Sequence, residues 1–239
     1  MRGLLVAHRG LHDAAQGRVE NSPSAFAAAI AAGHGIECDV HLAADDVAVV
    51  FHDATLDRLT GQGGPIGART SAQLGAIALG DTADTIPTLA QLLGQIGGRV
   101  PLLVEVKADV PDVAPLCAAV ARDLADYAGP VAIMSFDPAV PGWFARHMPG
   151  MARGLVIDRA DMAGRARSRW RAEALRLARP DFLALDVGAL PCRFARKWRA
   201  RGLAIATWTV RDAATCALAA VHADVPIAEG AAIAQNCPR

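Results

Sequence analysis

The feature that most limits the possible folds is the alternation of short apolar segments with alanine-rich segments of helical length. Eight segments have the length and composition of buried strands, at 4–8, 35–40, 102–107, 131–135, 154–157, 182–187, 203–208 and 223–228. Segments of helical length separate most of them, at 23–32, 88–96, 112–127, 138–147, 165–178, 193–201 and 212–220. Repeated strand and helix units favour a parallel sheet with right-handed crossovers, and eight units suggest closure into a barrel. The sequence therefore predicts an α/β fold of the TIM (β/α)8 barrel type.

The length and composition of the chain suit one domain of this kind. Its 239 residues, 53% of them hydrophobic, provide enough apolar material for one barrel core, and no low-complexity linker interrupts them. We expect a single domain over residues 1–239. Within it, a short stretch of about 53–87, rich in Gly and Thr, predicts a small cap.

One pair of predicted strands breaks the rhythm. Only four residues, 43–46, separate GIECDVHL from VAVVFHD, whereas a parallel crossover needs about a dozen residues or more. The second segment must therefore fold back as a short hairpin extension after the second strand. If Leu42 lies opposite Val47, then Glu37 lies opposite His52, and the hairpin returns this histidine to the carboxylates of the second strand.

Charge and cysteine content exclude several classes of partner. The 24 basic and 24 acidic residues balance, so net charge favours neither nucleic acid nor a membrane surface. The N-terminal MRGLLVAHRG lacks a signal-peptide core, and no apolar segment approaches membrane-spanning length, which together predict a cytoplasmic protein. The five cysteines have no CxxC spacing and predict reduced, packed thiols.

Polar side chains stand at the ends of four predicted strands, where apolar side chains would serve a core. These residues are His8 with Arg9, Glu37 with Asp39, Glu105 with Lys107, and Trp208. In an α/β barrel the carboxyl ends of the strands form the reaction face. We therefore expect these side chains to converge despite their separation in sequence.

Their chemistry fits phosphoryl transfer. The carboxylates of Glu37, Asp39 and Glu105 are hard oxygen ligands that suit Mg²⁺, Ca²⁺ or Mn²⁺ better than zinc. Two histidines, His8 and His52, titrate near neutrality and can act as general acid and general base. The arginine and the lysine of the same set add fixed positive charge for an anionic substrate.

Each of these motifs also has an ordinary structural interpretation when it stands alone. HRG can be a junction between strand and loop, ExD an exposed strand face, and ExK an ion pair along one strand face. Arg58 is interpreted as a residue that stabilises the loop after the hairpin, and His41 shares the strand face of the carboxylates as a further candidate. The joint occurrence of the motifs in order is what favours a site.

Taken together, these motifs resemble the glycerophosphodiester phosphodiesterase family. They appear here as AHRG, ENSPSAF, IECDV, VVFHDATLDRLTGQG, IPTLAQLL, LLVEVK, MSFD and TWTV. The match extends from His8 to about Val210, which is nearly the whole chain. The block through Gly61 is highly specific, because several polar positions recur together in fixed order and at similar spacing.

The resemblance implies a TIM barrel and the metal-dependent hydrolysis of glycerophosphodiesters to sn-glycerol 3-phosphate and an alcohol. It implies acid and base roles for His8 and His52, one divalent cation, Mg²⁺ or Ca²⁺, held by Glu37, Asp39 and Glu105, phosphate contacts by Arg9 and Lys107, and an aromatic wall formed by Trp208. In the mechanism usual for the family, a substrate glycerol hydroxyl attacks phosphorus, and the resulting cyclic phosphate is then hydrolysed.

The chain departs from the family pattern in two places. Arg211 follows TWTV where the family usually has asparagine, and the closing strand reads DVPIAEG, which places Glu229 near the position of an expected aspartate. Two alternatives therefore stay open: a related barrel phosphodiesterase that acts on lysophospholipids or another phosphodiester, and a barrel that binds its ligand without turnover. An exposed apolar rim would favour a lipid chain, and a polar mouth would favour a water-soluble headgroup.

Overall fold

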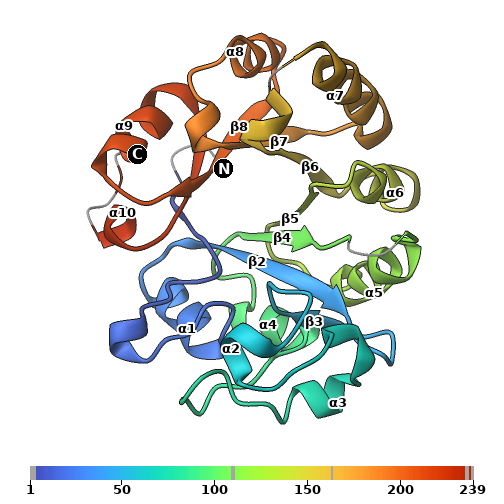
Figure 1. Ribbon diagram of the computed structural model, residues 1–239, viewed down its shortest axis with the longest axis vertical. Coiled ribbons are helices and arrows are strands. Elements are labelled where there is room, and N and C mark those ends of the chain that lie inside the picture. The colour runs from blue at the N-terminus through green and yellow to red at the C-terminus, as the bar shows by residue number, and fades with distance from the viewer. Residues whose placement is uncertain (1–3, 109–110, 163, 235–236, 238–239) are drawn as a thin grey trace. The chain divides into compact units, whose positions relative to one another are not determined.

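The computed structural model describes residues 4–108, 111–162, 164–234 and 237 (Figure 1). Its strands are β1 (Val6–Ala7), β2 (Gly35–Leu42), β3 (Ala48–Val50), β4 (Leu102–Val106), β5 (Val131–Ser135), β6 (Ala152–Ile157), β7 (Phe182–Asp186), β8 (Ala204–Val210) and β9 (Val225–Ala228). Its α-helices are α1 (Pro23–Ala31), α2 (Asp57–Thr60), α3 (Ser71–Leu74), α4 (Leu89–Ile96), α5 (Ala114–Leu124), α6 (Ala139–His147), α7 (Arg165–Ala178), α8 (Arg193–Arg199), α9 (Ala213–His222) and α10 (Ala231–Ala234). Short 3₁₀ helices lie at Ala14–Gln16, Ile66–Ala68, Arg159–Met162 and Val187–Ala189.

The chain divides into two compact units, one of Arg9–Val131 and one of the described residues within Met1–His8 and Ala132–Arg239. In the first unit, β2 pairs with β4 in parallel and with β3 in antiparallel orientation. Two helices of this unit start at side-chain caps: Ser22 accepts a hydrogen bond at the start of α1, and Thr88 forms a capping box with Gln91 at the start of α4. Helix α4 then buries its apolar face, which consists of Leu89, Leu92, Leu93 and Ile96.

The predicted hairpin is present, but its predicted register is wrong by one residue. Leu42 pairs with Ala48 and Val40 with Val50. Ala43 donates its backbone N–H to Val47 at 2.9 Å, so the turn contains three residues and ends at Asp46, whose φ is +57°. β3 ends at Val50, but the Phe51 N–H still donates to the Asp39 carbonyl at 3.0 Å, so pairing with β2 extends to the residue directly before His52.

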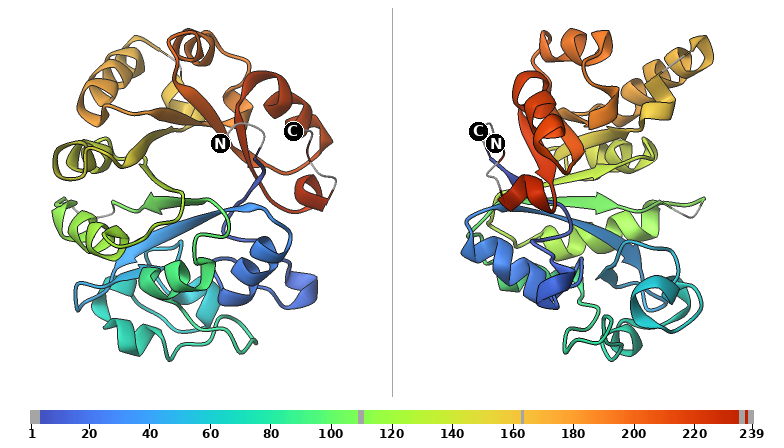
Figure 2. Two further views of the ribbon diagram at one scale, coloured as in Figure 1. Left: turned by 180° about the vertical axis from the view of Figure 1, so that it is seen from behind. Right: turned by 60° about the vertical axis from the view of Figure 1, so that its left-hand side comes forward.

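The stretch after the hairpin forms a small apolar core of its own. It contains α2 and α3 and packs on the hairpin through Ala43, Val49, Phe51, Leu56, Ile66, Leu74, Ile77, Leu79 and Ile86. Figures 1 and 2 show this segment, in cyan and teal, beside the carboxyl end of β2. The segment therefore anchors the residues that follow His52.

In the other unit, β6, β7, β8 and β9 pair in parallel in sequence order, and β1 pairs in parallel with β9. Helices α6 to α9 lie along the outer side of these strands (Figure 1). Buried Leu155, Leu183, Leu185 and Ile205 pack there with small alanines of α7 and α8. Across the described residues, eight parallel strands with flanking helices make this a TIM barrel fold, with β3 as an extra strand outside the ring.

The expectation of five reduced thiols is wrong for one pair. Cys216 of α9 and Cys237 form a disulfide bond, and Cys38, Cys117 and Cys192 are free thiols. The two bonded residues are 21 positions apart, and neither lies in a spacing motif, so only the fold of the intervening β9 and α10 brings their sulfurs together. In the described ranges, no helix combines the length and the apolar character needed to cross a bilayer.

Gly10, in the HRG motif, offers a direct test of packing against α1. Its φ is +80°, and a Cβ there would lie 3.0 Å from the Ala25 carbonyl carbon and from a ring carbon of Phe26. We expect Gly10→Ala to lower the free energy of unfolding by about 1–3 kcal/mol more than Gly17→Ala does. Gly17 is the matched control because its φ is +65° while its added Cβ meets nothing within 4 Å. Equal losses in urea unfolding would show that the close approach to α1 has no energetic effect.

Candidate active site: a buried carboxylate cluster

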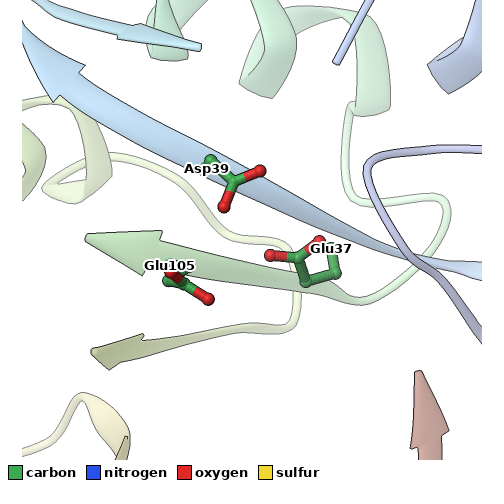
Figure 3. A group of neighbouring side chains, drawn as sticks. All are labelled: Glu37, Asp39 and Glu105. Carbon is green, nitrogen blue, oxygen red and sulfur yellow. The ribbon is translucent and has the colours of Figure 1, made fainter. Parts of the chain in front are cut away.

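Three carboxylates from two neighbouring strands meet in the Arg9–Val131 unit (Figure 3). Glu37 and Asp39 share one face of β2 because strand side chains alternate. The parallel register pairs Asp39 with Glu105 of β4. One ligand oxygen from each carboxylate lies within 4.8 Å of the others, and all three residues are buried. The sequence prediction that these carboxylates converge is confirmed by this geometry.

Two cations contact the carboxylate cluster. The Lys107 ammonium lies 2.8 Å from Asp39 Oδ1 and also contacts Glu105 Oε1. Arg9 places its Nε 3.4 Å from Asp39 Oδ2 and donates its backbone N–H to Glu37 Oε2 at 3.0 Å. The ExK motif is therefore an ion pair, as one interpretation of the sequence had it, and that ion pair lies within the predicted site.

Burial and like charge make full ionisation of the cluster costly. Burial, with repulsion from Asp39 and Glu105, holds the pKa of Glu37 well above its usual value. Burial also raises the pKa of Glu105 despite Lys107. For Asp39 the balance is reversed: Lys107, Arg9 and His52 outweigh burial and lower the pKa. The buried carboxylates therefore retain repulsion that a further cation would relieve.

A divalent cation fits this set of donors. Glu37, Asp39 and Glu105 offer only carboxylate oxygens, which is the ligand type that Mg²⁺ and Ca²⁺ prefer. The ligand oxygens of these three buried carboxylates lie within 4.8 Å of one another, and Lys107 and Arg9 balance their charge only in part. A divalent cation would stabilise such an arrangement.

Asn21 is a site residue that the sequence reasoning did not single out. Its Nδ2 donates to Asp39 Oδ2 at 2.9 Å, and its backbone N–H donates to the Arg9 carbonyl at 2.9 Å. The φ of Asn21 is +56°, a left-handed conformation that asparagine tolerates better than most residues. The available signal was its position in ENSP, directly before the Ser22 helix cap.

His52 is held by a chain of ion pairs. Its Nδ1 lies 2.6 Å from Asp53 Oδ1, and Arg58 Nε donates to the other oxygen of Asp53 at 2.6 Å. Arg58 also donates to Glu20 Oε1 at 2.7 Å, and the Arg9 guanidinium donates to the same oxygen at 2.6 Å. This chain, from His52 through Asp53, Arg58 and Glu20 to Arg9, connects the histidine with the cations of the cluster. The Nε2 atom of His41, the further candidate, lies 3.0 Å from the His52 carbonyl oxygen.

Arg58 provides a test of this chain. The Arg58 guanidinium, with the His52 hydrogen bond, lowers the pKa of Asp53 to about 2. We expect Arg58→Ala to raise the pKa of Asp53 toward about 3.9 and to lower kcat by about tenfold through a less ordered His52. Because an acid with a lowered pKa stabilises the fold above its ordinary pKa and loses this contribution as pH falls through the folded value, acid unfolding of the variant should begin at higher pH.

The measurements are a carboxyl NMR titration of Asp53 and an acid unfolding curve. The control is Arg69→Ala, which removes an exposed guanidinium that bonds Gln62 Oε1 in the same segment. An unchanged Asp53 titration in Arg58→Ala would show that the ion pairs do not act on this acid.

The other unit holds two further residues that the sequence singled out. His8 Nδ1 lies 2.6 Å from Glu229 Oε2. Trp208 of β8 donates its Nε1–H to the Ala184 carbonyl at 3.3 Å and meets Phe136 edge to face, with ring centroids 5.4 Å apart. The hydrogen bond fixes the indole ring, so the aromatic pair has a defined orientation.

Comparisons with known proteins identify a family and a fold to which this chain is similar. Residues 8–225 match the model of the glycerophosphoryl diester phosphodiesterase family. A Thermotoga maritima glycerophosphodiester phosphodiesterase is 25% identical, with a TM-score of 0.75 and coverage of 94% of this chain and 93% of that chain. An Oleispira antarctica phosphodiesterase, solved with its product sn-glycerol 3-phosphate, is 23% identical, with a TM-score of 0.80 and coverage of 95% and 93%. No curated protein sequence matches the chain significantly.

The family match contains the whole region in which the sequence motifs were found and extends from the HRG histidine to the start of β9. The resemblance inferred from those motifs is therefore confirmed. The chain belongs to the glycerophosphoryl diester phosphodiesterase family and is a phosphoric diester hydrolase.

Proposed function

We propose that this enzyme hydrolyses glycerophosphodiesters to sn-glycerol 3-phosphate and an alcohol with the help of one divalent cation, Mg²⁺ or Ca²⁺. The observation that carries this proposal is the buried cluster of Glu37, Asp39 and Glu105, whose oxygens lie within 4.8 Å of one another beside Arg9 and Lys107. The presence of sn-glycerol 3-phosphate as product in the Oleispira antarctica phosphodiesterase supports the choice of product.

Each group of the cluster has a defined task in this proposal. Glu37, Asp39 and Glu105 hold the cation, which when bound supplies positive charge to the phosphoryl oxygens. Arg9 and Lys107 contribute fixed positive charge that favours the more highly charged transition state. Asn21 orients Asp39 through its 2.9 Å hydrogen bond.

His8 and His52 are the proposed acid and base. One removes a proton from the attacking hydroxyl, and the other protonates the departing alcohol oxygen. Each histidine bonds a carboxylate through Nδ1, and this bond favours Nε2 as the nitrogen for proton transfer. Trp208, fixed by its bond to the Ala184 carbonyl, provides an apolar surface for the glycerol or the alcohol.

The structure also bears on the choice between a soluble headgroup and a lipid chain. Among the described residues, the large apolar side chains that are exposed are Phe136, Leu177 and Val221. They lie on three separate elements, just after β5, on α7 and on α9. This dispersion supports water-soluble diesters over lysophospholipids as substrates.

The test is release of glycerol 3-phosphate from glycerophosphocholine, glycerophosphoethanolamine and glycerophosphoglycerol, each with Mg²⁺, Ca²⁺, Mn²⁺ or excess chelator. Release that requires a divalent cation supports the proposal and ranks the headgroups. Faster turnover of lysophosphatidylcholine than of all three soluble diesters would assign the enzyme to lipid substrates instead. Absence of release from every diester under every metal would contradict the proposed reaction.

A further inference from the structure

Three side chains stand in a row just past the ends of three adjacent parallel strands. Ala7 of β1 pairs with Ala228 of β9, and Ala228 also pairs with Val210 of β8. The next residues along these strands are His8, Glu229 and Arg211. Strand register alone therefore places the carboxylate between the imidazole and the guanidinium.

Short hydrogen bonds join the three side chains. His8 Nδ1 lies 2.6 Å from Glu229 Oε2, and Arg211 Nε donates to Glu229 Oε1 at 2.6 Å. The backbone supports the same arrangement, because the Glu229 N–H donates to the Val210 carbonyl at 3.0 Å and the His8 N–H to the Ala228 carbonyl at 2.9 Å. Both oxygens of Glu229 are therefore engaged, one by each neighbour.

The burial of the row decreases from the histidine outward. The His8 side chain is 12% exposed and that of Glu229 is 20% exposed, whereas that of Arg211 is 61% exposed. The His8–Glu229 bond is thus shielded from water and retains most of its directional effect. The Arg211–Glu229 pair is solvated, so its main effect is on the orientation of Glu229.

A carboxylate at Nδ1 has two consequences for an acid/base histidine. It keeps the proton on Nδ1, so Nε2 is the nitrogen that accepts or donates the transferred proton, and it stabilises the imidazolium that forms during transfer. It also fixes the plane of the ring. A wrong tautomer or a rotated ring would leave His8 in place without a usable Nε2.

From this geometry we infer that Glu229 is a positioning residue for His8 and that Arg211 orients Glu229. The inference rests on the proposed role of His8 as an acid or base. It explains the two departures from the family pattern together, because the arginine after TWTV and the glutamate after the closing strand are partners of one another.

The kinetic test compares Glu229→Gln and Glu229→Asp with wild type. We expect Glu229→Gln to lower kcat by about 10–100-fold, with KM changed by less than about threefold, because the lost group supports a catalytic side chain. Glu229→Asp keeps the charge and should recover part of that loss. Arg211→Asn should lower kcat by no more than about fivefold, as expected for a solvated ion pair.

A control pair exists in the same unit. Glu173 and Arg176 of α7 form an exposed ion pair at 2.6 Å, and Glu173→Gln should leave kcat and KM unchanged. In the His8→Ala background, Glu229→Gln should have almost no additional effect, because a positioning residue acts through the residue that it positions. An undiminished additional loss in that background would overturn the inference.

A second readout does not depend on activity. The ¹⁵N chemical shifts of the His8 ring should show a proton on Nδ1 in the wild-type protein and a mixture of tautomers in Glu229→Gln. Wild-type protein that lacks all phosphodiesterase activity but shows the Nδ1–H tautomer would contradict the proposed function and leave the His8–Glu229 pairing supported. An Nε2–H tautomer in wild type would overturn the positioning role of Glu229.

Discussion

Glu37→Gln is expected to remove the response of this enzyme to divalent cations while leaving the metal-free fold at least as stable. Glu37 is fully buried beside Asp39 and Glu105, and the three ligand oxygens lie within 4.8 Å. Glutamine has nearly the same shape and removes one of three repelling charges, so the metal-free protein should not be destabilised. A carboxylate ligand of the cation is lost at the same time.

The metal-free protein should keep its stability in Glu37→Gln, whereas cation binding and turnover should both be weakened. Loss of a direct ligand should weaken binding of Mg²⁺ or Ca²⁺ by more than about 100-fold, since even groups that only support a ligand contribute 10–100-fold. Turnover should fall by about 10³-fold, because the cation is expected to contribute several kcal/mol to the transition state.

Thermal unfolding with and without metal measures both effects. A cation at about 100 times its Kd stabilises the folded state by about 2.7 kcal/mol, so the Tm of the wild-type protein should rise with Mg²⁺ or Ca²⁺ and that of Glu37→Gln should not. The control is Asp126→Asn, which changes an exposed acid in the same unit. A wild-type Tm that no divalent cation raises would contradict the metal site.

Removing either histidine is expected to have the second large effect. His8→Ala and His52→Ala should each lower kcat by about 10²–10⁴-fold, the usual contribution of general acid or base catalysis, with a much smaller change in KM. His147→Ala is the matched control, because His147 is exposed on α6 and its Nδ1 lies 2.9 Å from the carbonyl oxygen of Trp143 on the same helix. A loss of less than about tenfold in both variants would exclude acid/base catalysis by this pair.

A change of leaving group separates the roles of the two histidines. The p-nitrophenyl ester of glycerol phosphate releases an anion that needs no proton, so the variant that lacks the general acid should recover most of its rate on this substrate. The variant that lacks the general base should stay slow, because the attacking hydroxyl still has to lose its proton. Recovery of both variants or of neither would show that the two histidines do not divide the acid and base roles.

The site residues differ in how far the sequence could predict them. Glu37 and Asp39 were predictable as a pair, since alternation along a strand puts them on one face whatever the fold. Glu105 required the additional inference of parallel strands whose carboxyl ends meet, and the β2–β4 register confirms it. Asn21 was not predictable as a partner of Asp39, because a left-handed residue before a helix cap has many structural uses.

The hairpin shows where sequence reasoning fails by one residue. Four residues between two apolar segments required a reversal of the chain, and the reversal is present. The register depended on whether Leu42 or Ala43 closed the turn, and an additional backbone bond from Ala43 to Val47 decided it. Since strand side chains alternate, a shift of one residue moves a whole strand to the opposite face.

By itself, the sequence determined the alternation of strands and helices, the starts of the capped helices and the set of polar residues at the strand ends. These depend on local periodicity, on capping and on the spacing of motifs, all of which are properties of neighbouring residues. Only the tertiary structure decided which residues interact. Lys107 forms an ion pair with Asp39, Arg58 forms ion pairs with Asp53 and Glu20, and Cys216 forms a disulfide bond with Cys237. The row of His8, Glu229 and Arg211 belongs to the same class, because it depends on the register of three strands that are far apart in the chain, and pairing over such distances leaves no local signal.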